Sequence, residues 1–421
     1  MWRTSDERLD HLVVYTTAGA ETVPLGALRF EGSGKKRTSV FQYAQSWLRR
    51  DGAQPITPVH LPLRRKATLS VPFEVPLPFY DAAPDGWGRS VLERAFPKQV
   101  FGMAEFLAAT GNERTGNLRF GPTQTSGPER WVPSSEQVME IPGDEDSLAV
   151  LQEAAEAVDA GTAEPHHLRL LFRSSADQGG ARPKAVIHRE GTPWIAKFRA
   201  QGDAFDDPKV EAVCLSLAQA CGIEVPGHEV VEVAGRTALL VQRFDRNSDG
   251  GRLAYMSAGT LMGREPSAYY VSDTYADVAT KAREAGIRPC EGELFRRVLF
   301  NSFIHNTDDH LRNHAFVRDG EQWRLSPAFD LTVNRPPRLV LAPGKDILPL
   351  PNPEIVFGAY PRFRLTPTNA FGIYEEVAAG LRGYRALLDR YELTAADRDV
   401  LAAYWQHVQN PPSVPAAASA A

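Results

Sequence analysis

The most constraining feature of this chain is a polar cluster that ends an apolar segment and is followed by a short hairpin. Residues 298 to 304 are mostly apolar and predict a buried helix. The predicted helix stops at a cluster that runs from Asn306 to Asn313. Two short apolar runs joined by an Asp-Gly turn at Asp319 predict a β-hairpin, which brings the chain to Asp330.

This arrangement indicates phosphoryl transfer. That reaction needs a carboxylate to orient the attacking hydroxyl group, and it uses Asp and Asn oxygens to hold magnesium on the nucleotide phosphates. Kinase catalytic loops place the metal-binding Asn five residues after the base Asp, which is the spacing of Asn313 and Asp308. Kinases then return an Asp-Phe-Gly aspartate after a hairpin. Here the order is inverted, as Phe329-Asp330, and the glycine is missing.

Two other interpretations of the cluster remain. Asp308, Asp309 and Asn313 could cap a helix and form a turn, although three oxygen ligands and a connecting hairpin favour a site. His310 and His314 have the spacing of zinc ligands on a helix. They lack the glutamate of an HExxH motif, and the segment is too polar and broken to form one helical face. We therefore expect His310 to be a structural histidine beside the catalytic aspartate.

Length and composition exclude several classes of protein. The 421 residues are enough for two or three domains. The net charge of −5 gives no general electrostatic case for nucleic-acid binding. The three cysteines form neither a metal spacing nor an even disulfide set, which fits a reducing cytoplasm. We find no signal peptide and no apolar run of about 18 residues, so we expect no membrane span.

A second stretch suggests a phosphate-binding loop and a strand lysine. The Ser/Gly-rich loop 174–181 precedes a predicted strand at 185–188, and a turn at Gly191 leads to a strand over 194–198. Loop glycines let backbone N–H groups approach phosphate oxygens. Lys197 resembles the strand lysine that pairs with nucleotide phosphates in kinases. A plain hairpin turn and a solvated lysine are the alternatives, but the combination upstream of an Asp-Asn-Asp set favours nucleotide binding.

Three further features bear on this prediction. Glu211 is predicted to begin a helix that ends at Cys221; it either pairs with Lys197, as the kinase helix glutamate does, or is an exposed first-turn acid. A buried strand over 237–244 falls where a kinase hinge meets adenine. The segment Gly32 to Lys36 looks like a P-loop but lacks the first glycine and the final Ser or Thr, so we expect a basic hairpin turn.

The remaining elements are read from periodicity and composition. We expect strands within 8–30, ordered irregular chain over the Pro-rich residues 54–80, and a helix from the 81–89 segment through Arg94. We expect Leu118 to Phe120 to be a strand that enters the next module, and 123–147 to be a surface connection. Further helices are expected over 148–158, 276–285, 293–306, 374–391 and 395–408.

In combination these residues resemble the HipA family of serine/threonine kinases, known as toxins of bacterial toxin–antitoxin pairs. The resemblance covers most of the chain. It is carried in the N-terminal region by Phe41-Gln42-Tyr43, Trp47-Leu48, Leu61-Pro62-Leu63 and Pro84-Asp85-Gly86, and in the centre by residues 179–184 and Arg243-Phe244-Asp245-Arg246. The segment from Asn306 to Asn313 is similar to the family's catalytic loop.

The resemblance implies a role for each matching residue. Asp308 would be the catalytic base, Asn313 and Asp330 would hold Mg²⁺, and Lys197 would contact the α- and β-phosphates of ATP. The implied nucleotide-contacting set is completed by the phosphate loop (Gly179, Gly180, Ala181, Arg182, Lys184), the adenine-binding hinge (Gln242, Arg243, Phe244) and His310 beside the base.

The family often carries a serine just before its Gly-Ala loop, where autophosphorylation ejects the loop and silences the kinase. An ungapped match places Asp177 at that position, with Ser174 and Ser175 slightly upstream. Either serine is an autophosphorylation candidate if the loop is longer here. Otherwise this control is altered in the present chain.

The resemblance implies an α+β, two-lobed protein-kinase-like fold with an extra β-rich N-terminal module. We expect that module over 1–110, a β-rich nucleotide-binding lobe over 111–244, a helical catalytic lobe over 245–410 and a disordered tail over 411–421. ATP would lie between the two lobes. Phosphate would pass from ATP to a protein hydroxyl.

The resemblance also implies partners. Its substrate would be a protein, with an aminoacyl-tRNA synthetase as the family precedent. A helix-turn-helix antitoxin would bind it and provide an indirect link to DNA. The rival interpretation is a catalytically weak pseudokinase that acts as a co-repressor with a DNA-binding antitoxin, and a small-molecule kinase on the same scaffold is a third.

Overall fold

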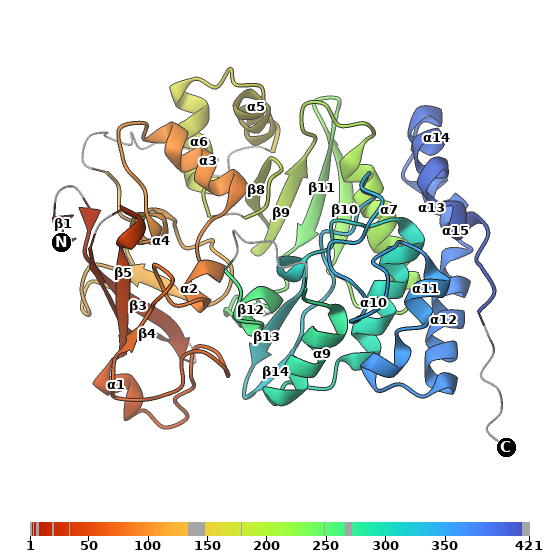
Figure 1. Cartoon of the computed structure of the whole chain (residues 1–421). Helices are drawn as coiled ribbons and strands as arrows, with labels where there is room; N and C mark the ends of the chain where they lie inside the picture. Colours follow the sequence, from red (N-terminus) through yellow and green to blue (C-terminus); the bar gives the residue numbers. More distant parts are fainter. Residues whose placement is uncertain are drawn as a thin grey trace. The chain divides into compact units, whose positions relative to one another are not determined.

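The computed structural model divides the chain into two compact units. The first is Met1–Gln201 with Asp245–Met256, and the second is Gly202–Phe244 with Ser257–Ala421. The structure describes residues 2, 4–5, 8–18, 21–32, 34–133, 148–177, 179–247, 249–265 and 272–414. Both units combine antiparallel strands with helices, as the α+β class predicts (Figure 1).

A five-stranded antiparallel sheet, in the order β6-β5-β4-β3-β7, forms the N-terminal part of the first unit. Its strands are β3 (His11–Ala18), β4 (Glu21–Glu31), β5 (Thr38–Tyr43), β6 (Thr68–Leu69) and β7 (Arg119–Gly121), with a separate pair of β1 (Thr4–Ser5) and β2 (Arg8–Leu9). The prediction that Leu118 to Phe120 enters the next module is wrong. Phe120 pairs with Val14 of β3 at the edge of this sheet, because its aromatic side chain is buried in the N-terminal core.

Aromatic side chains hold that core together. The ring of Phe79 lies 5.3 Å from Phe41 and 6.2 Å from Phe120, between centroids. The Pro-rich stretch contains little regular structure, as predicted. The helical elements here are η1 (Gly34–Lys36), α1 (Gln45–Leu48), α2 (Pro78–Asp81), α3 (Gly86–Ala95) and α4 (Met103–Ala109). The lysine-rich η1 connects β4 to β5, so the segment that looks like a P-loop is a connection within the sheet.

The rest of the first unit contains a helical pair and a hairpin. Helix α5 (Leu148–Asp159) packs on α6 (Pro165–Ser174), which also packs on α3. The predicted hairpin is present as β8 (Lys184–Arg189) and β9 (Thr192–Phe198), with Gly191 in the left-handed region at φ 76°. The short strand β12 (Ala254–Ser257) lies at the end of Asp245–Met256, the second segment of the first unit.

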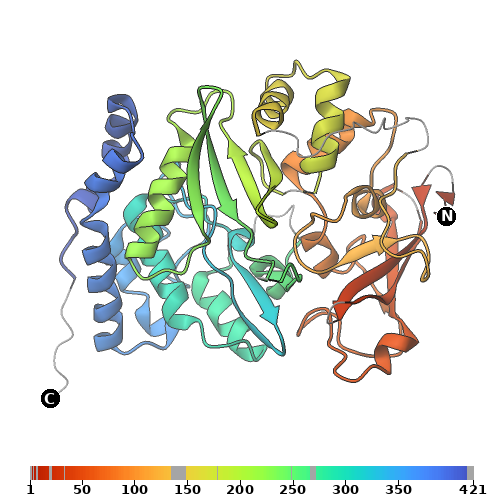
Figure 2. The same ribbon diagram turned by 180° about the vertical axis from the view of Figure 1, so that it is seen from behind.

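In the second unit, helix α7 (Asp207–Ala220) packs on a hairpin of β10 (His228–Val233) and β11 (Arg236–Gln242) (Figure 2). The predicted start of this helix at Glu211 is wrong. The side chain of Asp206 caps the helix by accepting from the Lys209 N–H at 3.3 Å, and Pro208 occupies the first turn. Glu211 therefore lies in the second turn and is buried. The alternative of an exposed first-turn acid is also wrong.

Helix α10 (Glu291–Ile304) forms the centre of the helical part of this unit. It packs against α9 (Tyr275–Glu284), α11 (Pro353–Phe357) and α12 (Pro367–Leu381). Its buried aromatic side chains include Phe295, Phe300 and Phe303. The further elements are α8 (Ala258–Leu261), α9 (Tyr275–Glu284), α10 (Glu291–Ile304), η2 (Leu311–Asn313), β13 (Ala315–Asp319), β14 (Gln322–Leu325), α11 (Pro353–Phe357), η3 (Tyr360–Phe363), α12 (Pro367–Leu381), α13 (Tyr384–Arg390), α14 (Ala395–Tyr404) and α15 (Gln406–Gln409).

Each of the two helices predicted near the C-terminus is divided in the structure. The first breaks between α12 and α13 at Arg382 and Gly383, and the second breaks at Trp405. Gly383 is a weak helix former, which explains the first break. The buried Trp405 donates from Nε1 to the Ile304 carbonyl at 3.0 Å, so a tertiary contact accompanies the second break.

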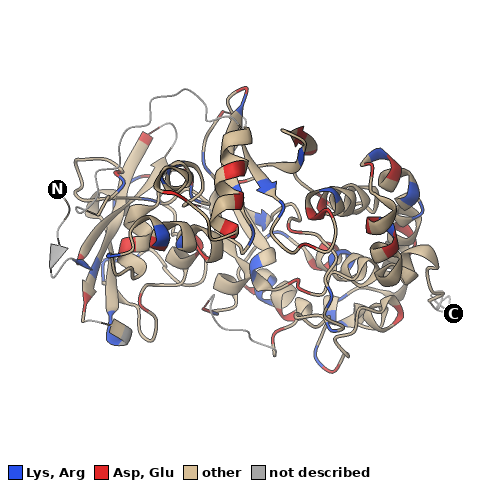
Figure 3. Ribbon diagram, turned by 90° about the horizontal axis from the view of Figure 1, so that it is seen from above, with Lys and Arg blue, Asp and Glu red and all other residues tan. Residues whose placement is uncertain are grey.

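Charged residues of both signs are interspersed along the described ribbons (Figure 3). Among the helices of the described residues, none is long and apolar enough to cross a membrane. Residues 134–147 of the predicted surface connection and residues 415–421 of the predicted tail lie outside the described residues.

Candidate active site

The chain leaves α10 at His305, which adopts the left-handed region with φ 59°. This conformation costs a residue other than glycine about 1–2 kcal/mol, because Cβ crowds the following carbonyl oxygen. Contacts with Asn334 hold the turn. The Asn334 N–H donates to the His305 carbonyl at 3.1 Å, and His305 Nδ1 lies 2.8 Å from the Asn334 carbonyl oxygen. These contacts therefore fix the backbone at the start of the loop that follows α10.

Asp308 is the exposed residue of this loop, and its N–H donates to Oδ1 of Asn334 at 3.3 Å. Burial of its carboxyl is the largest influence and raises the pKa of Asp308. The nearby charges of His310 and Arg312 lower this pKa and the carboxylate of Asp330 raises it, so that the net shift is upward. These influences place His310 and Asp330 within electrostatic reach of Asp308. A carboxylate with a raised pKa is a better proton acceptor than an ordinary aspartate.

The two other predicted oxygen ligands come from the segments on either side of the hairpin. Asn313 is buried at the end of η2, and its N–H donates to the His310 carbonyl at 2.9 Å. Asp330 is exposed and has a left-handed backbone with φ 60°. The preceding Phe329 packs on Phe244, with their ring centroids 5.3 Å apart. Asp330 therefore follows a residue that is held against the end of the predicted hinge.

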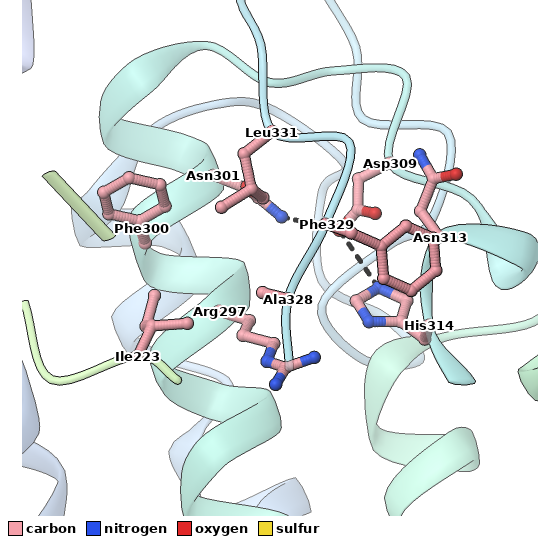
Figure 4. A pocket seen from close by; sticks show the side chains of 10 residues that line it. All are labelled: Ile223, Arg297, Phe300, Asn301, Asp309, Asn313, His314, Ala328, Phe329 and Leu331. Carbon is pink, nitrogen blue, oxygen red and sulfur yellow. Dashed lines mark hydrogen bonds and ion pairs between the residues drawn. The ribbon is translucent and has the colours of Figure 1, made fainter. Parts of the chain in front are cut away.

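Asp309 is buried, and its carboxylate is the centre of a hydrogen-bonded cluster. The sequence predicts this residue only as part of a turn. Its Oδ2 atom accepts hydrogen bonds from the Tyr275 hydroxyl and from Asn301 Nδ2 at 2.5 Å, and lies 3.0 Å from His314 Nε2. Asp309 and His314 are among the residues that line a small pocket (Figure 4). The Tyr275 partner lies 34 residues before Asp309 in the sequence, so spacing within the motif could not reveal that contact.

The predicted phosphate loop docks on the N-terminal end of α3. The Gly180 N–H donates to Asp85 Oδ1, and the Trp87 N–H donates to the Gly180 carbonyl at 2.7 Å. A Cβ atom at Gly86 would lie only 2.5 Å from that carbonyl oxygen, so glycine is required there. The Pro-Asp-Gly motif and the Gly-Gly loop are thus one structural element, which sequence separation concealed.

Two predicted phosphate-binding lysines are neighbours on the hairpin. Lys184 on β8 and Lys197 on β9 are directly opposite each other in the antiparallel register. Like charges at such positions repel each other, whereas a polyphosphate would be attracted to both. Gly180, with φ 80°, closely approaches the Lys184 ammonium group. The loop and the two lysines therefore lie close together in the first unit.

The autophosphorylation candidates lie beside this loop. Ser174 Oγ donates to the Leu170 carbonyl at 3.1 Å within α6. Ser175 is fully buried; its hydroxyl donates to the Lys184 carbonyl and accepts from Trp87 Nε1 at 2.6 Å. Phosphorylation of Ser175 would require this packing to open.

Asp177, at the position of the family's serine in the ungapped match, is a buried structural acid. Its carboxylate accepts hydrogen bonds from the Gly111 N–H and from the Glu113 N–H, the latter at 2.7 Å. Arg130 Nη2 also lies 3.2 Å from Asp177 Oδ1. The carboxylate therefore anchors residues 111–113 to the start of the loop.

The predicted hinge follows β11. The strand ends at Gln242, which is exposed and donates its N–H to the Gly227 carbonyl at 2.7 Å. Arg243 is buried and Phe244 is half-buried, so Arg243 and Phe244 lie after the strand and not within it, contrary to the predicted span of 237–244.

The donor set suits a hard divalent cation. Asp330 supplies carboxylate oxygens and Asn313 supplies an amide oxygen, which are the ligand types that Mg²⁺ takes together with substrate phosphates. Asp330 also raises the pKa of Asp308, so negative charge is already concentrated where a cation would be favoured. The residues present therefore fit the expected metal.

Two family models match this chain and identify its family. Residues 18–121 match the family model of the HipA N-terminal domain, and residues 176–349 match that of the HipA-like C-terminal domain. The chain belongs to the HipA-like family. The N-terminal match contains α3, and the C-terminal match contains the glycine loop that docks on it and the loop that follows α10.

Two curated relatives that match part of this chain are named putative kinases. The chain is 28% identical over 151 residues to "Putative kinase Y4mE" and 29% identical over 178 residues to "Putative kinase Y4dM", both from Sinorhizobium fredii. These matches cover 32% and 38% of this chain, and 36% and 41% of the relatives' lengths. The chain therefore spans about two fifths of the curated relatives that it matches.

A solved structure of HipA from Shewanella oneidensis MR-1, in complex with HipB and operator DNA, has the same fold. The TM-score is 0.65 with 16% sequence identity, and the match covers 94% of this chain and 95% of that one. The predicted two-lobed, kinase-like fold with an added N-terminal module is confirmed. The roles of individual residues and the exact domain boundaries remain predictions.

Proposed function

We propose that this chain is an ATP-dependent serine/threonine protein kinase of the HipA type. The observation that carries the proposal is the placement of two exposed acids, Asp308 and Asp330, on the two segments that the β13–β14 hairpin connects, where Asp330 contributes to the raised pKa of Asp308. Asn313 lies on the same short loop as Asp308. An orienting base and two oxygen ligands in this arrangement match the needs of phosphoryl transfer.

Each group would have a distinct task. Asp308 would accept a hydrogen bond from the attacking protein hydroxyl and orient it, and its raised pKa would favour acceptance of the proton. Mg²⁺, held by Asn313 and Asp330, would supply positive charge for the phosphates. Gly179 to Lys184 and Lys197 would bind phosphate oxygens, and Gln242 to Phe244 would contact adenine.

Partners of this chain are proposed from the same family. The solved HipA structure contains HipB and operator DNA. We propose that a helix-turn-helix antitoxin binds this chain and connects it indirectly to DNA. The substrate would be a protein, and an aminoacyl-tRNA synthetase is a candidate from the family resemblance. We place the protein in the cytoplasm and propose that it autophosphorylates at Ser174 or Ser175.

The alternative is a pseudokinase that acts as a co-repressor. It would bind nucleotide without turnover, and its effect on operator binding would survive Asp308→Ala. The presence of Asp308, Asn313 and Asp330 together favours the enzyme. A small-molecule kinase would instead leave the phosphoproteome of expressing cells unchanged relative to the Asp308→Ala variant.

Transfer of labelled γ-phosphate from Mg²⁺–ATP to cell proteins tests the proposal. Asp308→Ala and Asp330→Ala should each abolish transfer while the far-UV circular dichroism stays that of the original chain. Asp399→Ala, at an exposed position on α14, is the matched control and should retain transfer. Unchanged transfer in either purified, folded active-site variant would refute the assignment.

A further inference from the structure

A buried polar cluster outside the proposed reacting groups converges on one atom. Oδ2 of Asp309 accepts from the Tyr275 hydroxyl on α9, from Asn301 Nδ2 on α10, and lies 3.0 Å from Nε2 of His314, which precedes β13. Asn301 Nδ2 also donates to the Tyr275 hydroxyl at 2.9 Å. Three elements are thereby tied to one carboxylate.

The cluster is shielded from solvent. Tyr275, Asn301, Asp309 and His314 are 1%, 1%, 4% and 2% exposed. Hydrogen bonds that involve a charged group are stronger than neutral ones, and each is costly to leave unmade at a buried position. The Tyr275 ring also packs edge-on against His314, with centroids 4.9 Å apart. The hydrogen bonds and the ring contact therefore fix the positions of these four side chains.

The position of Asp309 connects the cluster to the proposed chemistry. Asp308 is exposed whereas Asp309 is buried, so the two consecutive side chains face opposite sides of the loop. Asn306 Nδ2 donates to Asn301 Oδ1 at 3.1 Å, which ties the start of the loop to the same helix residue. At the far end, the cluster includes His314, the residue after Asn313.

We propose that Asp309, Tyr275, Asn301 and His314 form a positioning network that holds the loop from Asp308 to Asn313 in its reactive geometry. The inference rests on the proposed kinase function and adds four residues to it. They act by fixing the backbone from which Asp308 and Asn313 project, because small displacements of reacting groups lower rates strongly.

A purely structural role is the alternative, and a matched pair of substitutions separates the two. Tyr275→Phe removes one buried hydroxyl from the network and keeps the ring. Tyr374→Phe does the same at a buried tyrosine of α12, whose hydroxyl donates to the Pro412 carbonyl. Both variants should remain folded, whereas only Tyr275→Phe should disturb the loop.

The experiment measures ATP hydrolysis and transfer of labelled phosphate to a Ser/Thr peptide library with the full chain in Mg²⁺–ATP. We expect Tyr275→Phe to lower kcat about tenfold or more, with KM for ATP changed less than about twofold. Tyr374→Phe should keep kcat within about twofold of the original. Equal kcat values for the two tyrosine variants would overturn the inference.

Rescue by a conservative residue provides a second readout. His314→Gln keeps an N–H donor near the place of Nε2, whereas His314→Ala removes it. We expect kcat to recover at least about threefold in the glutamine variant relative to the alanine variant. Asp308→Ala is measured in parallel. Retained transfer there would refute the proposed function, whereas loss there with a normal Tyr275→Phe would refute the positioning network alone.

Discussion

The carboxylate of Asp330 raises the pKa of Asp308. Burial of the Asp308 carboxyl raises this pKa most. The charge of His310, the second influence, lowers it, and the carboxylate of Asp330, the third, raises it. The two acids are separated by the β13–β14 hairpin, so the relationship depends on that hairpin forming.

The first prediction concerns the titration of Asp308. Replacing its negative neighbour by Asp330→Asn should lower the pKa of Asp308, because the like charge that disfavours ionisation is removed. The side-chain carboxyl of Asp308 can be followed by ¹³C NMR during a pH titration. Asp399→Asn is the control at an exposed position on α14 and should leave the Asp308 titration unchanged. An unaltered pKa in Asp330→Asn would show that the two acids do not interact.

The second prediction is a gain in stability on loss of the proposed base. Because the folded-state pKa of Asp308 is raised, its ionised form disfavours folding at neutral pH. Asp308→Asn should therefore raise Tm by about 1–2 °C near pH 7. The gain should vanish as pH falls through the folded pKa and below the ordinary value of 3.8, where wild-type Asp308 is protonated in both states. Calorimetry at several pH values tests this, and a lower Tm at pH 7 would contradict it.

The third prediction concerns Lys184 and Lys197, which are cross-strand partners. Removing either ammonium group should weaken Mg²⁺–ATP binding about tenfold, because each would contribute charge-assisted hydrogen bonds to phosphate. Isothermal titration measures this affinity. Lys281→Ala on α9, where the lysine pairs with Glu284, is the control and should bind normally. If ATP affinity is unchanged in both variants, the lysines do not bind phosphate.

The fourth prediction concerns the anchoring of the glycine loop. Gly180→Ala places a Cβ atom on a left-handed residue that closely approaches the Lys184 ammonium group, at a cost of about 1–2 kcal/mol. Trp87→Phe removes the indole hydrogen bonds to Ser175 and to the Lys184 carbonyl, each worth about 1 kcal/mol. Both variants should increase hydrogen exchange of the loop.

The glycine-loop variants need a control for the loss of a buried indole donor. Trp405→Phe removes such a hydrogen bond in the other unit, to the Ile304 carbonyl. It should leave exchange over residues 179–184 unchanged. If Trp87→Phe and Trp405→Phe exchange alike in that segment, the loop is not held by α3.

The sequence predicted local features with strong signals. The Asp-Gly turn, the buried helix before the polar cluster and the strand that carries Lys197 are present in the structure. Some boundaries were misplaced where two local signals competed. Helix α7 begins near Pro208 because the Asp206 cap and the proline outweigh Glu211 as a start signal. The strand at Phe120 joins the N-terminal sheet, because a three-residue strand contains no information about its partner.

The sequence by itself determined the order and types of the candidate groups: a base, an amide and a second acid, spaced as in HipA-like kinases. Only the tertiary structure decided which groups support them. The contact of Asp309 with Tyr275 and the docking of Gly180 on α3 join residues far apart in the chain. Spacing and periodicity report on neighbours within one element, whereas these contacts depend on how separate elements pack.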